Sequence, residues 1–179
     1  MIEVLFRHGG TFDKYVGDEL MALFGAPTSM PSAPQAAVVC ALDMQKELGV
    51  FNQRLVKSGR APIAIGIGIH TGRALCGTLG SSKTMQYTAI GDTVNTASRL
   101  CSVAGPGQVL LSAVTMELVH GEVEVRELPA VVVKGKSRAL EVFDTVGRMS
   151  SSCPPRPVVQ ALRFFAGITT GFRAICRLE

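Results

Sequence analysis

The sequence has no tryptophan, only two tyrosines and 18% charged residues. Its five cysteines include no CxxC pair and no Cys/His spacing of the kind that binds zinc. An odd number of thiols in mostly apolar contexts predicts reduced, buried cysteines in a cytoplasmic protein. No apolar run reaches the roughly 18 residues of a membrane span, and the N-terminus lacks the apolar core of a signal peptide. These absences argue against a disulfide scaffold, a zinc module and a helical membrane protein.

The chain also lacks a basic stripe for nucleic acid. Residues 148–179 contain five arginines and one glutamate, which account for the whole net charge of +4. Residues 1–147 therefore carry 13 basic and 13 acidic residues and are neutral as a body. A neutral body without clustered Lys or Arg does not favour nucleic-acid binding.

The length and the 47% hydrophobic content predict one folded domain with a full core. We place this domain at residues 1–147 and treat 148–179 as a linker and a basic, apolar tail. The stretch 158–178 is predicted to be either an amphipathic helix for a membrane surface or a partner, or a tail without fixed structure.

Residues 86–100 carry the strongest local signal of a site. They read as a strand, a Gly-Asp turn and a helix that begins near Thr93. On that helix Asn95 and Arg99 are four residues apart and share one face. An amide beside a permanently charged guanidinium suits a polyphosphate, although an Arg paired with a surface carboxylate fits these residues equally well. Three positions on the other face are expected in the core: Val94, Ala97 and Cys101.

Alternating residues predict a β-hairpin over 11–24, with Asp18 at its tip. A helix is expected over 34–58, where apolar residues recur every three or four positions (Ala37, Ala41, Met44, Leu48, Phe51 and Leu55). Further strands are predicted at 63–69, 73–79, 109–111, 123–128, 131–133 and 140–146, with a helix from Ser112 to about 120. In the strand at 63–69, isoleucines alternate with smaller residues, which gives one bulky face and one small face that a helix or a partner strand can approach closely. His70, at a strand end without a nucleophile in view, is interpreted as a structural histidine. The pattern predicts an α/β fold with a mixed sheet and helices packed on it.

With these pieces placed, the chain resembles the catalytic domain of class III nucleotide cyclases, in the form of the bacterial adenylate cyclases. The resemblance rests on four segments in the family's order: GTFDKYVGD (10–18), IGIHTG (67–72), YTAIGDTVNTASRL (87–100) and VKGK (133–136). It implies an α+β sandwich of the ferredoxin-like type. It also implies conversion of ATP to 3′,5′-cyclic AMP and pyrophosphate in cyclic nucleotide signalling, at a site formed between two head-to-tail protomers.

The resemblance also implies a role for each matching residue. Asp18 matches a ligand of two Mg²⁺ or Mn²⁺ ions, and Lys14 and Thr88 match the positions that read the purine. Asn95 and Arg99 match the pair that orients the ribose and stabilises charge on the α-phosphate. Lys134 matches a contact to the terminal phosphates, with Lys136 as a neighbouring candidate. A lysine donor and a hydroxyl suit adenine.

The chain departs from the family pattern at its start. The family domain begins earlier, with two helices and a central strand that carries the first metal aspartate, so we expect an uncovered slot in the sheet. This departure raises a second hypothesis, a catalytically impaired pseudo-cyclase or fragment that binds nucleotide or dimerises as a regulatory module. A diguanylate cyclase, suggested by the hairpin alone, ranks far lower because it has no place for the Asn95/Arg99 helix.

We therefore expect residues 1–179 alone to form little cyclic AMP with Mg²⁺ or Mn²⁺. One carboxylate alone does not hold two ions in place about 3.5–4 Å apart, and poor metal placement costs on the order of a thousandfold in rate. The measurement compares cyclic AMP formed by 1–179 with that formed by a version extended upstream by the missing strand. Robust turnover by 1–179 would mean that another residue supplies the second metal ligand.

Overall fold

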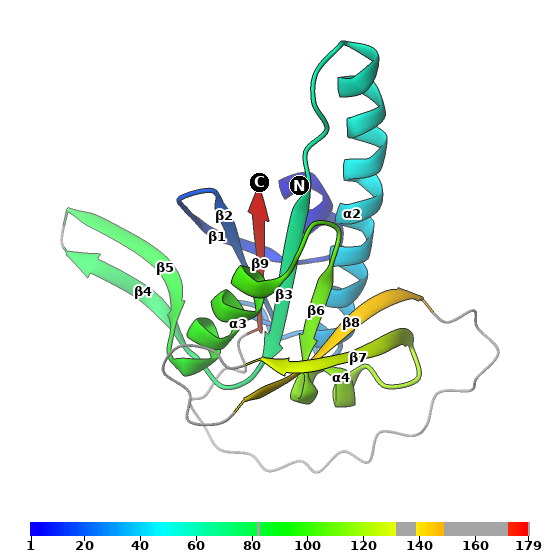
Figure 1. Ribbon diagram of the computed structural model, residues 1–179. Helices are drawn as coiled ribbons and strands as arrows, with labels where there is room; N and C mark the ends of the chain where they lie inside the picture. The colour runs from blue at the N-terminus through cyan, green and yellow to red at the C-terminus, as the bar shows by residue number, and fades with distance from the viewer. Residues whose placement is uncertain (82, 132–138, 149–171, 179) are drawn as a thin grey trace.

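The computed structural model describes residues 1–81, 83–131, 139–148 and 172–178 (Figure 1). Its helices are α1 (Ile2–Arg7), α2 (Ala33–Lys57), α3 (Asp92–Val103) and α4 (Ala113–Leu118). Its strands are β1 (Thr11–Val16), β2 (Glu19–Phe24), β3 (Ile65–Thr71), β4 (Leu75–Ser81), β5 (Thr84–Ile90), β6 (Val109–Ser112), β7 (Val123–Val131), β8 (Leu140–Arg148) and β9 (Phe172–Leu178).

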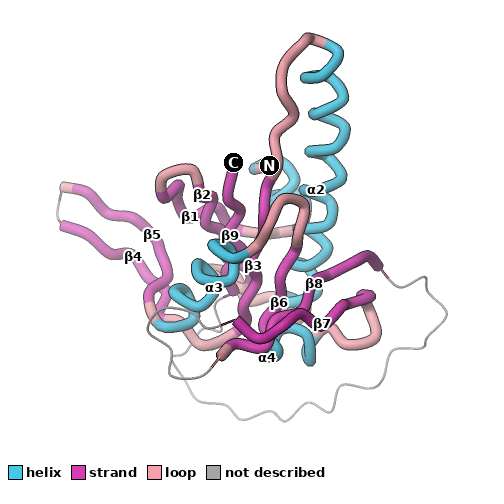
Figure 2. The backbone as a smooth tube through the Cα atoms, viewed as in Figure 1, coloured by secondary structure: helices cyan, strands magenta, loops and turns pink. Residues whose placement is uncertain are grey.

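Seven strands form one sheet in the order β1-β2-β9-β3-β6-β8-β7. β3 and β6 run parallel, whereas the other neighbouring pairs are antiparallel. Helices cover both faces of this sheet (Figure 2). The predicted mixed sheet with packed helices is thus confirmed. The division of the chain at residue 147 stays a prediction.

The two faces of the sheet follow the alternation of the sequence. Ile65, Ile67 and Ile69 pack in one core with the inward side of α2 and with α1. On the opposite face, Met21 and Leu23 pack against Ala74 and Ala89 near the base of β4 and β5. Because successive strand residues point to opposite faces, a single strand such as β2 serves both cores.

Helix α3 lies directly on the backbone of β3 because Gly66 and Gly68 have no side chains. A Cβ placed on Gly68 would run into the backbone of Cys101 and Leu100, and one on Gly66 into that of Ala104. The small face predicted for 63–69 is therefore the seat of α3, the helix with the Asn95/Arg99 pair. Its close approach fixes where those two side chains stand.

The expectation of an uncovered slot in the sheet is wrong. β9 lies between β2 and β3 and pairs antiparallel with both, Cys176 standing opposite Leu20 on one side and Ile67 on the other. The part of the tail at 172–178 is thus a strand, neither helical nor unstructured. Antiparallel partners on both sides satisfy the backbone groups that the open edges of β2 and β3 would leave unpaired.

Helix α2 spans Ala33–Lys57, within one residue of the predicted bounds at each end, with Ser32 at its N-cap and Pro34 in its first turn. Five of its six predicted core residues are buried, namely Ala37, Ala41, Met44, Leu48 and Leu55. Phe51 is 46% exposed, which corrects the prediction. The outer turns of α2 project beyond the sheet, where no strand offers a partner surface (Figure 1).

β7 is one strand across residues 123–131, where two strands at 123–128 and 131–133 were predicted. Its pairing with β8 shifts register between Leu128 and Val131, which accommodates Pro129. A bulge of this kind is one of the few places where a strand tolerates proline. Residues 132 and 133 lie outside the described part of the chain.

β4 and β5 form a separate two-stranded sheet that leaves the body as a long arm (Figures 1 and 2). Four large apolar side chains on this arm are exposed: Leu75, Leu79, Met85 and Ile90. None of the helices in the described ranges is long and apolar enough to cross a membrane.

We predict that Gly68→Ala lowers the free energy of unfolding by about 1–3 kcal/mol, because the added methyl group forces α3 away from β3. Gly77→Ala is the matched control, since a Cβ there meets no atom within 4 Å. Its unfolding free energy should stay within about 0.5 kcal/mol of wild type. Urea unfolding measures both, and equal stabilities of the two variants would show that the α3–β3 contact can relax.

Candidate active site

The β1–β2 hairpin presents Asp18 at a two-residue turn, as predicted. Val16 pairs with Glu19 across the turn, and Gly17 has φ of 63°. A positive φ at the first central position only is typical of a type II′ turn, which favours glycine there. Asp18 follows it and is exposed to solvent.

A β-bulge in β1 changes the direction of two candidate side chains. The register steps from Phe12 opposite Ala22 to Lys14 opposite Met21, so Asp13 has no partner on β2. In a regular strand, Asp13 and Lys14 would point to opposite faces, whereas a bulge re-aims the side chains beside it. The rings of Phe12 and Tyr15 lie 5.1 Å apart, as this local kink allows.

Asp13 is buried and is the centre of a polar cluster between β1 and β5. The Thr88 hydroxyl donates to Asp13 Oδ2 at 2.7 Å. Gln86 Nε2 donates to the Asp13 carbonyl oxygen at 3.0 Å and approaches Oδ1 at 3.5 Å. Lys14 Nζ lies 3.6 Å from Oδ1. The two residues predicted to read the purine, Lys14 and Thr88, are therefore held by one carboxylate.

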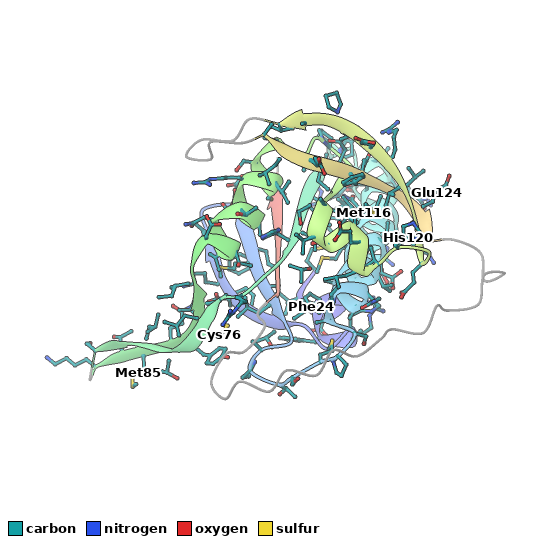
Figure 3. The ribbon with its side chains drawn as sticks, turned by 90° about the horizontal axis from the view of Figure 1, so that it is seen from below. Phe24, Cys76, Met85, Met116, His120 and Glu124 are labelled. Carbon is teal, nitrogen blue, oxygen red and sulfur yellow. The ribbon has the colours of Figure 1, made fainter. Side chains whose placement is uncertain are left out.

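The charge of Asp13 extends to the first strand of the arm. Burial, and then the negative charge of Asp13, raises the pKa of the Cys76 thiol. Cys76 lies where the arm joins the body (Figure 3). Burial, and then Cys76, raises the pKa of Tyr87. Both groups stay protonated at neutral pH, so no thiolate nucleophile is indicated here.

Helix α3 begins at Asp92, one residue before the predicted start, and places Asn95 and Arg99 on one side. Asn95 is exposed, and Ala97 and Cys101 are fully buried, as predicted. Val94 is half-buried at the edge of the Met21/Leu23 core, so its predicted burial is only partly right. It lies on the flank of the helix, beside the side that meets the sheet.

Arg99 is half-buried, so its predicted exposure is only partly right. Its Nη1 atom is buried and has no hydrogen-bond partner within the described residues. A buried cationic donor without an acceptor is costly unless an anionic group completes it. The alternative reading, an arginine paired with a surface carboxylate, therefore does not describe Nη1.

His70 donates to or accepts from the Ser112 hydroxyl through Nδ1 at 2.8 Å. Ser112 also accepts from the Thr115 backbone N–H as the N-cap of α4. The histidine thus belongs to a network that ties β3 to β6 and α4, which supports its structural interpretation.

Among the described residues, no group of three or more His, Cys, Asp or Glu side chains stands close enough to hold a metal ion. Asp18 is one carboxylate at a turn. That donor suits a single ion bound mainly through phosphate oxygens, and it does not fit a site for two ions within one protomer. Lys134 and Lys136 lie outside the described residues.

A hollow of about 580 Å³ lies between α1 and the outer part of α2, lined by Met1, Val4, Arg7 and Phe51 among others. No candidate residue lines it. The described candidate residues instead stand on the hairpin, on β5 and on α3, on the side of the sheet opposite α2.

The decisive comparison is with protein families, because residues 7–145 match the family described as "Adenylate and Guanylate cyclase catalytic domain". The chain belongs to this family. Cyclase domains of this family bind a nucleotide, act as dimers and in general use divalent metal ions.

Curated relatives include "Adenylate cyclase 1" of Rhizobium meliloti, 36% identical over 147 residues. "Adenylate cyclase" of Anabaena cylindrica is 34% identical over 145 residues. These matches cover 81% and 76% of this chain but only 22% and 28% of the relatives. The chain thus spans about a quarter of their length.

Solved structures of both specificities are equally similar to this cyclase domain. The adenylyl cyclase CyaB from P. aeruginosa matches with a TM-score of 0.78 and 35% identity, over 81% of this chain and 76% of that one. The guanylyl cyclase Cya2 matches with a TM-score of 0.79 and 35% identity, over 84% and 77%. Overall similarity therefore does not distinguish ATP from GTP as the substrate.

Sequence reasoning missed Asp13 and Gln86. Simple alternation places Asp13 on the opposite side of β1 from Lys14, and the bulge invalidates that rule here. The one available signal was an acidic residue directly before a candidate lysine, and that signal is weak in isolation.

We predict that Arg99→Met leaves the free cyclase domain as stable as wild type or about 1 kcal/mol more stable, because it removes a buried donor without a partner. Arg126→Met is the control: Arg126 donates to Asp144 at 2.8 Å, and Asp144 is nearly buried. That variant should lose about 1 kcal/mol. Urea unfolding compares them, with inorganic triphosphate expected to stabilise wild type but not Arg99→Met. A large loss in Arg99→Met would instead indicate a structural partner.

Proposed function

We propose that this chain is the catalytic domain of an adenylate cyclase, which converts ATP to 3′,5′-cyclic AMP and pyrophosphate in cytoplasmic cyclic nucleotide signalling. The observation that carries the proposal is the meeting of Lys14 and Thr88 on Asp13, although they stand far apart in the sequence. Family membership makes the chain a cyclase domain, and these two residues are the basis for proposing adenine as the nucleobase that it recognises.

Lys14 and Thr88 offer a pattern of hydrogen bonds that suits adenine. Adenine presents an acceptor at N1 and a donor at its 6-amino group, whereas guanine presents a donor at N1 and an acceptor at O6. The Lys14 ammonium can only donate, which suits adenine N1. Thr88 stands beside it and receives the 6-amino group.

Asn95 and Arg99 act on the ribose and the α-phosphate in this proposal. The 3′ hydroxyl releases its proton to solvent as its oxygen attacks the α-phosphorus, the bond to the bridging oxygen of the β-phosphate breaks, and pyrophosphate leaves. Asn95 orients the ribose through its exposed amide. Arg99 faces the charge that grows on the α-phosphate, and its buried Nη1 needs an acceptor of that kind.

A head-to-tail homodimer would complete the site, with Asp18 of one protomer facing the base readers and α3 of the other. The arm supports this arrangement because it exposes Leu75, Leu79, Met85 and Ile90, an unusual concentration of apolar surface for a monomer. Met85 lies far out along the arm (Figure 3).

Asp18 is the residue we assign to Mg²⁺ or Mn²⁺, and Lys134 to the terminal phosphates. When bound, the ions would lower the charge of the phosphates and the pKa of the 3′ hydroxyl. Since the described residues do not fit a two-ion site, the steps above are assigned to the chain's own side chains alone.

A regulatory pseudo-cyclase is the second candidate, and the single carboxylate at the hairpin favours it. Such a module would bind ATP and dimerise without turnover. The two candidates share the base-reading pair and differ in product formation, so binding and chemistry have to be measured separately.

The test replaces Lys14 by Glu and Thr88 by Cys, side chains that suit guanine. Wild-type 1–179 should bind ATP more tightly than GTP by calorimetry, and the double variant should shift that preference toward GTP by about ten- to a hundredfold, since an unmatched buried donor or acceptor costs about 1–3 kcal/mol. Prolonged incubation with Mn²⁺, read by mass spectrometry, detects cyclic AMP and cyclic GMP.

Cyclic AMP as the main product supports the cyclase, and ATP binding without any product supports the pseudo-cyclase. The Gly77→Ala variant, which is unchanged at the candidate residues, serves as the control and should bind both nucleotides as wild type does. Equal binding of ATP and GTP before and after the swap would remove Lys14 and Thr88 from base reading.

A further inference from the structure

The Asp13 carboxylate has a chemical consequence for Thr88. A hydroxyl has one proton to donate and two lone pairs with which to accept. A carboxylate only accepts, so the 2.7 Å contact between Thr88 Oγ1 and Asp13 Oδ2 engages the hydroxyl proton. The Thr88 oxygen then faces any further partner as an acceptor.

We propose that Asp13 is the positioning residue that sets adenine selectivity, by turning the Thr88 hydroxyl into an obligate acceptor and by drawing the Lys14 ammonium alongside it. This inference rests on the proposed function, because it assumes that Lys14 and Thr88 face the base. An acceptor at Thr88 matches the adenine 6-amino group and repels guanine O6.

Burial of the Asp13 carboxylate fixes the direction in which the Thr88 hydroxyl donates. The Asp13 side chain has 0% exposed surface, so water does not compete for its lone pairs. Its Oδ1 receives Lys14 and Gln86, and its Oδ2 receives Thr88. Each oxygen is thus already committed, and the hydroxyl cannot turn away from Oδ2 without leaving a buried acceptor unmatched.

The β-bulge is what makes the arrangement possible. Without the extra residue, Asp13 and Lys14 would alternate across β1, and one carboxylate could not serve both the lysine and β5. Gln86 reinforces the bulge by donating to the Asp13 carbonyl oxygen at 3.0 Å. The backbone and the side chain of Asp13 are therefore fixed by the same neighbour.

Asp13→Asn is the sharpest variant, because it keeps the size and reverses one hydrogen bond. Lys14 and Gln86 are both donors, so the amide oxygen of the new side chain should face them. Its NH₂ group should then face Thr88. That NH₂ donates to Thr88 Oγ1, and the hydroxyl proton becomes free to point at the base. Thr88 then donates its hydroxyl proton to guanine O6.

The experiment measures binding of four nucleotides to the full chain by calorimetry without metal: ATP, GTP, ITP and purine riboside triphosphate, which lacks the 6-amino group. Wild type should bind ATP about tenfold more tightly than purine riboside triphosphate, and ITP and GTP more weakly than ATP. In Asp13→Asn, ATP and purine riboside triphosphate should bind within about twofold of each other, and the preference for ATP over ITP should shrink about tenfold.

Thr88→Val is the matched variant, since it removes the hydroxyl and leaves Asp13 in place. It should equalise ATP and purine riboside triphosphate without any gain for ITP. A second readout follows Asp13 itself: Asp13→Asn should lower the pKa of Cys76, seen as faster alkylation of the Cys76 peptide near neutral pH, because Asp13's charge contributes to that raised pKa.

The outcomes separate the two proposals. If no nucleotide binds, or wild type does not prefer ATP, the proposed function and this inference fail together. If the swap of Lys14 and Thr88 changes the preference but Asp13→Asn keeps all four affinity ratios, Asp13 does not set selectivity. A uniform weakening of all four nucleotides in Asp13→Asn would likewise overturn it, because that is the mark of a purely structural residue.

Discussion

The absence of two side chains on β3 sets the geometry of the whole molecule. Gly66 and Gly68 let α3 rest on the strand backbone, and no other residue would permit that distance without moving the helix. Because α3 carries Asn95 and Arg99 and follows directly from β5, its depth also fixes where Thr88 stands relative to the sheet. The position of the candidate site therefore depends on the packing contact between α3 and β3, which lies on the opposite side of α3 from Asn95.

Much of this arrangement could be predicted from the sequence, because the signals were local. The Gly-Asp turn, the apolar period of α2 and the small alternating face of β3 each lie within a few residues, and each was confirmed. Asn95 and Arg99 were placed correctly on one helix for the same reason, since spacing on a helix depends on nothing outside it.

The remaining features depend on partners distant in sequence. The bulge at Asp13 depends on how β1 pairs with β2 and on the hydrogen bonds that Asp13 makes to β5. The alternation of residues in the sequence does not reveal one extra residue of this kind. Phe51 has the spacing of a core residue, but α2 outruns the sheet there. β9 joins strands that lie more than a hundred residues earlier in the chain, a pairing for which local propensity gives no signal.

The central place of β9 in the sheet also affects the order in which the domain can fold during synthesis. Residues 172–178 leave the ribosome long after β2 and β3, so the two strands that flank the centre of the sheet emerge with facing edges and nothing to join them. The nascent domain would then pass through a stage in which its sheet is divided in two, each part competent to pair with a neighbouring chain. Any sequence fused after residue 178 would extend from a central strand and not from a peripheral end.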